Sequence, residues 1–159
     1  WQPPVRQIYE RCKVYSKVRG ELEGREVRIG EDQGVLRNMY VADSMETARR
    51  EAEEGIMSIF QYNDPYRGTQ VFMNPGEKPD PDAKLSWDFL EPRALLVGSA
   101  DHIIERLEEH EEICDLDEIL IGYAHHRVPQ KKTLKNLELF ATRIIPHFEK
   151  RARTNAAAE

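Results

Sequence analysis

The stretch Leu95-Leu96-Val97-Gly98-Ser99-Ala100-Asp101-His102-Ile103-Ile104 decides the fold class of this chain. Its apolar start predicts a short buried strand, and the Gly-Ser pair ends that strand. Ser99 has the side chain of a helix N-cap, and Asp101 lies in the first turn, where a carboxylate complements the helix dipole. These residues therefore predict a strand that passes directly into a helix.

The same succession continues towards the C-terminus. The apolar run 118–124 predicts the clearest strand of the chain, and apolar residues at three- and four-residue spacing then predict a helix that reaches Phe148. Pro146 is expected to bend this helix, because proline has no N–H and crowds the preceding turn. Strands that alternate with helices indicate parallel strands joined by crossovers.

The first part of the chain has a matching pattern. Apolar residues on one helical face predict a helix over 5–18, which Gly20 and Gly24 are expected to end. Residues 35–42 predict a third strand. The sequence therefore predicts an α/β fold with three parallel strands, and a sheet this narrow has two open edges that favour pairing with further strands.

A helix is predicted to follow the strand at 35–42 and to reach Phe60. Asp43 or Ser44 is its expected N-cap, and Glu46 lies three residues after Asp43, as in a capping box. Capping is therefore the leading interpretation of Asp43 and Ser44, although both residues also follow the end of a strand.

Residues 61–92 differ from the rest of the chain, because they combine many prolines with many aromatic side chains. The prolines exclude long regular structure, and the aromatic residues argue against a disordered linker. We expect an ordered, irregular excursion with a short helix near 83–90, and such a segment is a candidate lid. Residues 1–153 are expected to form one domain, with 154–159 as a disordered tail.

Composition limits the classes of function. The net charge is −6 and 33% of the residues are charged, which is typical of an acidic cytoplasmic protein and argues against a nucleic-acid partner. Cys12 and Cys114 are too few for a disulfide framework, so a reducing compartment is expected. No apolar run approaches the ~20 residues of a membrane span, so no membrane partner is expected.

Three stretches resemble the bacterial luciferase-like flavin-dependent monooxygenases. The first, Arg37-Asn38-Met39-Tyr40-Val41-Ala42-Asp43-Ser44, is similar to the family's strand "vyVAdt" and precedes an alanine-containing helix. The second, Leu95 to Ser99 with Ile103 to Leu107, is similar to the family's "G-[ST]-P-eeV" segment. The third joins 117–121 to a helix that closes on Ile145-Pro146-His147-Phe148, like the family's "vmPhf" ending. The order and spacing of the three carry the resemblance, which covers roughly residues 8–151.

The resemblance implies a fold and an activity. Family members are (β/α)₈ barrels, and this chain would supply the last three strands with their helices, without the half that carries most of the flavin contacts. The implied reaction uses FMN, reduced by a partner flavin reductase, and dioxygen to oxidise a small organic substrate. A deazaflavin coenzyme, as in another branch of the superfamily, is an alternative.

Two further alternatives remain open at this point. The chain could be a non-catalytic half-barrel module that completes its sheet by forming a homo-oligomer or by pairing with a partner chain. It could also be a small α/β domain of unrelated function. The substrate is not predicted, because a fold analogy does not identify one.

Candidate pocket residues follow from the barrel template, in which active sites lie at the carboxyl ends of the strands. Gly98 and Ser99 could let the backbone and a helix N-terminus approach an anion, although capping is the leading interpretation of Ser99. Tyr123, His125, His126 and Arg127 follow the strongest strand, and a histidine there could donate a hydrogen bond to cofactor or substrate. A polar surface loop is the alternative. No catalytic residue is assigned.

A metal site is not expected. His110 and Cys114 lie four residues apart on a predicted helix, but no third ligand converges on them. His125 and His126 are adjacent, so their side chains should point to opposite sides of an extended chain.

Overall fold

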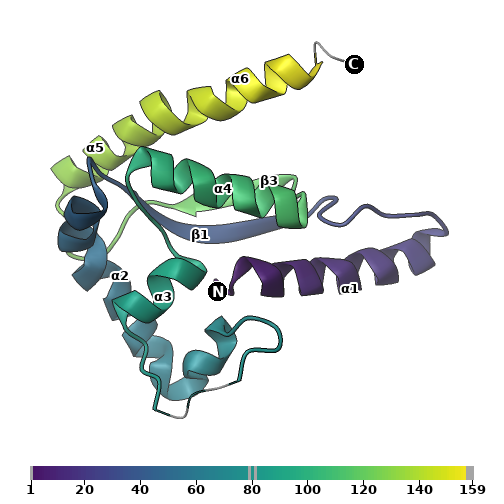
Figure 1. Ribbon diagram of the computed structural model, residues 1–159, viewed down its shortest axis with the longest axis horizontal. Helices are drawn as coiled ribbons and strands as arrows, with labels where there is room; N and C mark the ends of the chain where they lie inside the picture. Colours follow the sequence, from purple (N-terminus) through teal and green to yellow (C-terminus); the bar gives the residue numbers. More distant parts are fainter. Residues whose placement is uncertain (1, 79, 81, 157–159) are drawn as a thin grey trace.

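The computed structural model describes residues 2–78, 80 and 82–156. The elements in chain order are α1 (Val5–Glu23), β1 (Gly34–Val41), α2 (Met45–Arg67), the 3₁₀ helix η1 (Thr69–Phe72), α3 (Trp87–Ala94), β2 (Leu96–Gly98), α4 (Ala100–Cys114), β3 (Glu118–Gly122), α5 (Gln130–Leu139), the π-helical segment η2 (Phe140–Ile144) and α6 (Ile145–Ala156). In Figure 1, β1 lies between α1 and the long α5–α6 helix. None of the helices in the described residues is long and apolar enough to cross a membrane.

The three strands are parallel, as predicted, and β1 is the central strand of the order β2-β1-β3. The first half of β1, Gly34 to Asn38, pairs with β3, and its last residues, Met39 to Val41, pair with β2. Three consecutive strands of a barrel would lie in chain order. Here the longest strand instead has two short neighbours, one on each side.

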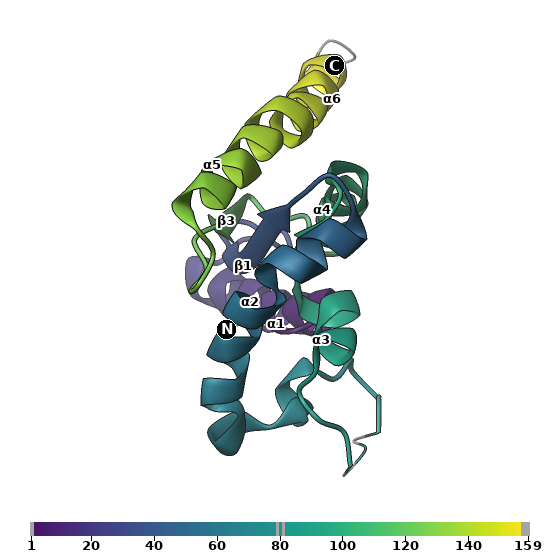
Figure 2. The ribbon, with the colours of Figure 1, turned by 90° about the vertical axis from the view of Figure 1, so that its left-hand side faces the viewer.

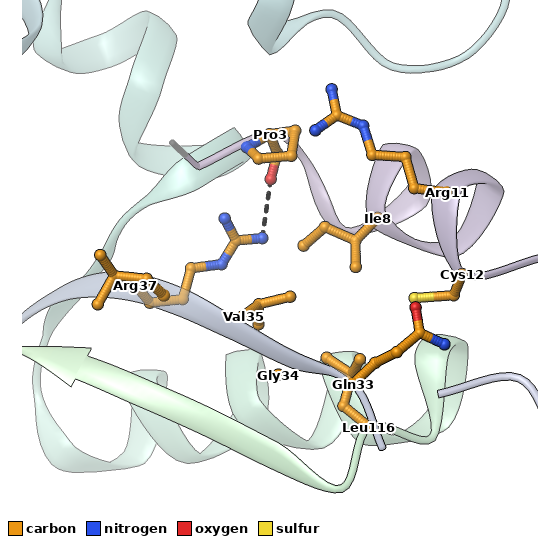
Figure 3. Close-up of a pocket in the computed structure, with 10 residues that line it drawn as sticks. Pro3, Ile8, Arg11, Cys12, Gln33, Gly34, Val35, Arg37 and Leu116 are labelled. Atoms are coloured by element: carbon orange, nitrogen blue, oxygen red, sulfur yellow. Dashed lines mark hydrogen bonds between the residues drawn. The ribbon is translucent and has the colours of Figure 1, made fainter. Parts of the chain in front are cut away.

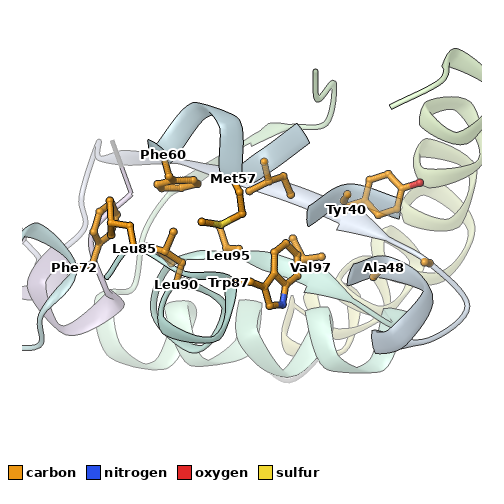
Figure 4. Close-up of a cluster of buried hydrophobic side chains, with 14 residues drawn as sticks. Tyr40, Ala48, Met57, Phe60, Phe72, Leu85, Trp87, Leu90, Leu95 and Val97 are labelled. Carbon is orange, nitrogen blue, oxygen red and sulfur yellow. The ribbon is translucent and has the colours of Figure 1, made fainter. Parts of the chain in front are cut away.

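Successive residues of β1 point to opposite faces of the sheet, and each face has its own core. Met39 and Val41 pack with side chains of α4 and η2. Tyr40 packs on the other face with α2 and α3, in a cluster that includes Trp87 and Leu90 (Figure 4). The connection from β1 to β2 and the connection from β2 to β3 run across the sheet in opposite directions. Because such crossovers between parallel strands are right-handed, α2 and α4 lie on opposite faces of the sheet.

One face of the sheet is only partly covered. Leu36 lies on the same face as Tyr40 but nearer the amino end of β1, beyond the reach of α2 and α3. It is 46% exposed, and Leu120 of β3, its partner in the sheet register, is 47% exposed. Two neighbouring leucines on an open sheet face are the position where a further layer of structure would pack.

The first helix is longer than predicted, since it continues through Gly20 to Glu23. Gly24, with φ 66°, ends it in the left-handed conformation, and the N–H groups of Gly24 and Arg25 both donate to the Gly20 carbonyl. A Cβ at Gly20 would lie 2.8 Å from the Arg25 carbonyl oxygen. Gly20 therefore permits the close return of the chain and does not stop the helix.

The irregular excursion is shorter than the predicted 61–92. Helix α2 extends to Arg67, because a helix in contact with the core can continue beyond the end of its apolar pattern. The short helix predicted near 83–90 begins at Trp87, where Ser86 accepts a hydrogen bond from the Phe89 N–H. Residues 79 and 81 lie outside the described part of the chain, and the role of a lid stays a prediction.

The bend expected at Pro146 takes the form of a wider turn. The π-helical segment η2 ends two residues before Pro146 and adds a residue to the turn that proline would otherwise crowd. Helix α6 then continues to Ala156, so the prediction of a disordered tail from 154 is wrong for 154–156. The C-terminal helix supplies its own backbone hydrogen bonds there, and 157–159 lie outside the described residues.

Candidate functional site

Parallel strands end at one edge of the sheet, and this edge holds the residues predicted from sequence. Figure 2 views the molecule from the side on which β1 ends and α2 begins. Ser44 follows β1, Ser99 follows β2 and Tyr123 follows β3. The topology therefore places all three segments at the carboxyl edge, as predicted.

Gly98 does not open towards a ligand. A Cβ on Gly98 would lie 2.2 Å from Met45 Sδ and 3.0 Å from His102 Cδ2. Side chains of the chain itself therefore fill the space beside this glycine. Met45 of α2 lies against the backbone of Gly98. The expectation that an anion approaches this backbone is therefore not met.

Ser99 acts as the N-cap of α4, since its Oγ accepts a hydrogen bond from the His102 N–H at 3.3 Å. Ser44 caps α2 in the same way, with its Oγ accepting from the Thr47 N–H at 3.1 Å. Asp43, the other predicted cap, instead accepts from Lys135 Nζ at 2.6 Å.

Replacing Ser99 with alanine is expected to lower the free energy of unfolding by about 1 kcal/mol, because the first turn of α4 loses an acceptor. Ser99→Asp should keep the cap and restore most of that stability. Urea denaturation of the two variants checks this. If Ser99→Ala is as stable as the unchanged chain, Ser99 has a role other than capping.

His125 is part of the core. It is 6% exposed, its ring centroid lies 6.3 Å from that of Tyr40, and its Nε2 donates to the Met39 carbonyl oxygen at 2.9 Å. A carbonyl can only accept, so Nε2 carries the proton and Nδ1 is an acceptor, which has no partner among the described residues. Burial lowers the pKa of His125, so the ring is neutral at physiological pH.

The next two residues face solvent, as expected for neighbours of a buried histidine. His126 and Arg127 are exposed, Arg127 has φ 63°, and its guanidinium pairs with Glu54 of α2. Tyr123 is 43% exposed. The predicted cluster is therefore divided between three exposed side chains and the buried His125.

Gly55 of α2 makes the contact that positions this loop. A Cβ on Gly55 would lie 2.0 Å from the carbonyl oxygen of His126. Alanine in a helix interior normally stabilises the helix by about 1 kcal/mol relative to glycine. Here the clash with the carbonyl oxygen of His126 outweighs that gain. We expect Gly55→Ala to destabilise the chain by about 2 kcal/mol. Thermal unfolding measures this, with Arg50→Ala, at an exposed position of the same helix, as the comparison. A stabilised Gly55→Ala variant would contradict the loop position.

Asn136, which the sequence analysis did not select, joins the ends of two strands. It is 1% exposed, its Oδ1 accepts from the Val41 N–H at 2.8 Å, and its Nδ2 donates to the Tyr123 carbonyl oxygen at 3.4 Å. An asparagine among the apolar positions of a predicted helix was the available signal. Its amide provides one acceptor and one donor where β1 and β3 stop pairing.

A second missed network joins β1, α2 and α5. Tyr40 Oη donates to Glu51 at 2.9 Å, and Lys132 Nζ pairs with the same carboxylate at 3.1 Å. Burial raises the pKa of Tyr40, and the Glu51 carboxylate raises it further. Burial also acts to raise the pKa of Glu51, but the bonds from Tyr40 and Lys132 outweigh it, so the Glu51 pKa is lowered.

These contacts decide how well the carboxyl edge fits a flavin. A flavin phosphate needs free cations or N–H donors. Lys132, Lys135 and Arg127 instead pair with carboxylates of the same chain, and Met45 fills the space beside Gly98. Among the described residues of this edge, these three cations are therefore not free to bind a flavin phosphate. The described residues also contain no group of three or more metal-ligating side chains.

The amino end of β1 has a different character. A hollow of about 270 Å³ lies there between α1 and β1 (Figure 3), and the buried guanidinium of Arg37 forms part of its wall. Arg37 Nη2 donates to the Pro3 carbonyl oxygen at 2.8 Å, and Nε donates to His110 Nε2 at 3.0 Å. His110 Nδ1 donates in turn to the Arg106 carbonyl oxygen at 2.6 Å.

Burial dominates the titration of this pair. It lowers the pKa of Arg37 to about 10, with Arg106 adding to the effect. It lowers the pKa of His110 to about 4, with Arg37 as the next cause. Arg37 is therefore charged and His110 neutral at pH 7. The sequence signal for this site was an arginine between apolar residues of a predicted strand.

Two solved structures share this fold. The monooxygenase RslO1 from Streptomyces bottropensis matches 91% of this chain and 39% of its own, with TM-score 0.66 and 15% identity. The oxygenating constituent of 3,6-diketocamphane monooxygenase from the CAM plasmid of Pseudomonas putida, a type II Baeyer–Villiger monooxygenase in complex with FMN, matches 90% and 40%, with TM-score 0.68 and 21% identity.

The sequence matches no protein-family model and no curated protein. The chain spans about two fifths of the length of the two structures that it matches. Its fold is therefore the predicted α/β fold of three parallel strands with helices, and it corresponds to about two fifths of each of these two structures.

Proposed function

We propose that this chain is part of a luciferase-like, flavin-dependent monooxygenase, an oxidoreductase that uses reduced FMN and dioxygen on a small organic substrate. The observation that carries the proposal is the match of 90% of the chain to a monooxygenase in complex with FMN. The three sequence motifs occur in the order of the same family and support it independently.

Under this proposal the chain contributes one wall of the enzyme. Because Lys132, Lys135 and Arg127 are paired and Met45 occupies the space beside Gly98, residues outside the chain would contact the flavin phosphate and ring. The open sheet face at Leu36 and Leu120 is then the face that further strands enclose. Tyr123, His126 and Arg127, three of the predicted pocket residues, are exposed at the carboxyl edge, and we propose that they line the pocket entrance.

The test uses the natural polypeptide that contains this chain. We expect it to quench flavin fluorescence with one FMN bound per protein. We also expect it to consume dioxygen when a flavin reductase supplies reduced FMN. When a small organic substrate is added, an oxygenated product should form. Absence of flavin binding, with oxygen uptake no faster than that of free reduced FMN, would contradict the proposal.

The open sheet face favours a second candidate, a non-catalytic module that completes its sheet with another copy. Leu120→Lys should convert an oligomer of the chain into monomers, because a lysine cannot be buried unpaired between two sheets. Light scattering after gel filtration measures this. Leu22→Lys, at an 83% exposed position on α1, is the matched control and should not change the mass. A monomeric unchanged chain excludes the module.

A further inference from the structure

The hollow between α1 and β1 contains a buried positive charge without a counterion. Arg37 is 1% exposed, and its Nη1 is buried with no hydrogen-bond partner in the described structure. Its Nη2 and Nε donate to a carbonyl oxygen and to a neutral histidine, and it forms no ion pair with a carboxylate of the described residues, since the nearby Glu109 pairs with Arg106. Burying a charge is costly unless it is paired, so a buried guanidinium in this state favours an anionic partner.

The other polar groups around the hollow are donors too. Gln33 Nε2 is buried and has no partner among the described residues. Arg11, at the exposed rim, bonds only to the Gln7 side chain at 3.4 Å and forms no ion pair within the described chain. None of the residues that line the hollow is acidic. The residues that line the hollow therefore include no carboxylate to pair with these donors.

The remaining lining is apolar and sets the shape of a ligand. Ile8 and Cys12 of α1 face Val35 of β1 across the hollow, with Leu116 at its base (Figure 3). A volume of about 270 Å³ is close to the lower limit for small-molecule sites. Arg37 lies towards one end of this space and the apolar side chains fill the centre. The arrangement suits a compact ligand with one charged end and a short hydrocarbon body.

We propose that this hollow binds a small carboxylate with a short apolar tail. The carboxylate accepts from the unpartnered Nη1 of Arg37, and Arg11 closes over it from the rim. The tail packs between Ile8, Val35 and Leu116. The site lies at the amino end of β1, away from the carboxyl edge, so it does not depend on the proposed flavin chemistry.

The test is a titration of the 159-residue chain with hexanoate, followed by two-dimensional NMR of backbone and side-chain N–H groups. We expect saturable shifts at Arg37 and Gln33 with a Kd on the order of 1 mM, as a ligand of this size allows. Hexanamide, which has the same tail without the charge, should bind about tenfold more weakly, because it loses the charge-assisted hydrogen bonds.

Three variants locate the site while leaving the contacts of Arg37 in place. Arg11→Gln should weaken hexanoate binding several-fold, and Leu116→Trp, which fills the hollow, should abolish it. Arg143→Gln removes an exposed arginine from the α5–α6 helix and should bind like the unchanged chain. The NMR spectra also show that each variant is folded. Equal binding of hexanoate and hexanamide, unaltered binding by Leu116→Trp, or equal losses in Arg11→Gln and Arg143→Gln would overturn the proposal.

Discussion

Replacing Asn136 with alanine is expected to lower the free energy of unfolding by about 3 kcal/mol. The change removes the acceptor of the Val41 N–H and the donor to the Tyr123 carbonyl, and both backbone groups lie where water is largely excluded. Each unsatisfied buried group costs ~1–3 kcal/mol. Urea denaturation monitored by circular dichroism measures the loss.

Lys135→Ala is the matched control for Asn136. Lys135 is the neighbouring residue of α5, and its pair with Asp43 is mostly exposed, so its loss should cost much less stability than the loss of Asn136. Asn136→Asp separates the two bonds, because a carboxylate still accepts from Val41 but cannot donate to Tyr123. If Asn136→Ala costs no more than Lys135→Ala, Asn136 does not link the two strand ends.

Lowering the pH from 6.5 to about 4 is expected to cost about 3 kcal/mol of stability through His110 alone. The imidazole must stay neutral in the folded state, because it accepts from Arg37 and burial disfavours its charge. In the unfolded chain it protonates near its ordinary pKa of 6.5. The unfolded state therefore binds the additional proton first, and the stability conferred by neutral His110 is present above pH 6.5 and is lost as the pH falls.

The measurement compares unfolding of the unchanged chain and a His110→Gln variant at pH 7 and pH 4.5. Glutamine offers one acceptor and one donor without titrating, so the variant should lose much less stability on acidification. His125, whose pKa burial also lowers, contributes equally to both proteins and cancels. A pH dependence that is the same in both proteins would show that His110 is accessible to protons in the folded state.

The sequence predicted the parts of the fold that depend on local chemistry. Caps at Ser44 and Ser99, the three strands and the parallel pairing followed from side-chain type and spacing. The strand order could not be predicted from sequence. A sheet paired in chain order and a sheet with β1 in the centre have the same pattern of apolar residues within each strand. The extent of α2 was missed as well, since the helix continues to Arg67, beyond the end of its apolar pattern at Phe60.

The residues predicted for the candidate site lie together at the carboxyl edge of the sheet, but His125 is buried while its predicted partners are exposed. Sequence cannot distinguish a buried His125 from an exposed one, because the outcome depends on whether Gly55 lets the loop approach α2. The same limit applies to Arg37. A charged residue in a strand signals an exception, but only the packing of α1 shows that the charge is enclosed and unpaired.

We propose that this chain is one portion of an FMN-dependent monooxygenase. An experimental structure of the natural polypeptide that contains it, determined with FMN, tests this proposal. We expect further parallel strands that enclose Leu36 and Leu120, and a flavin at the carboxyl edge near Tyr123 and His126. A structure in which that sheet face stays open to solvent, or in which FMN is bound elsewhere, would contradict it.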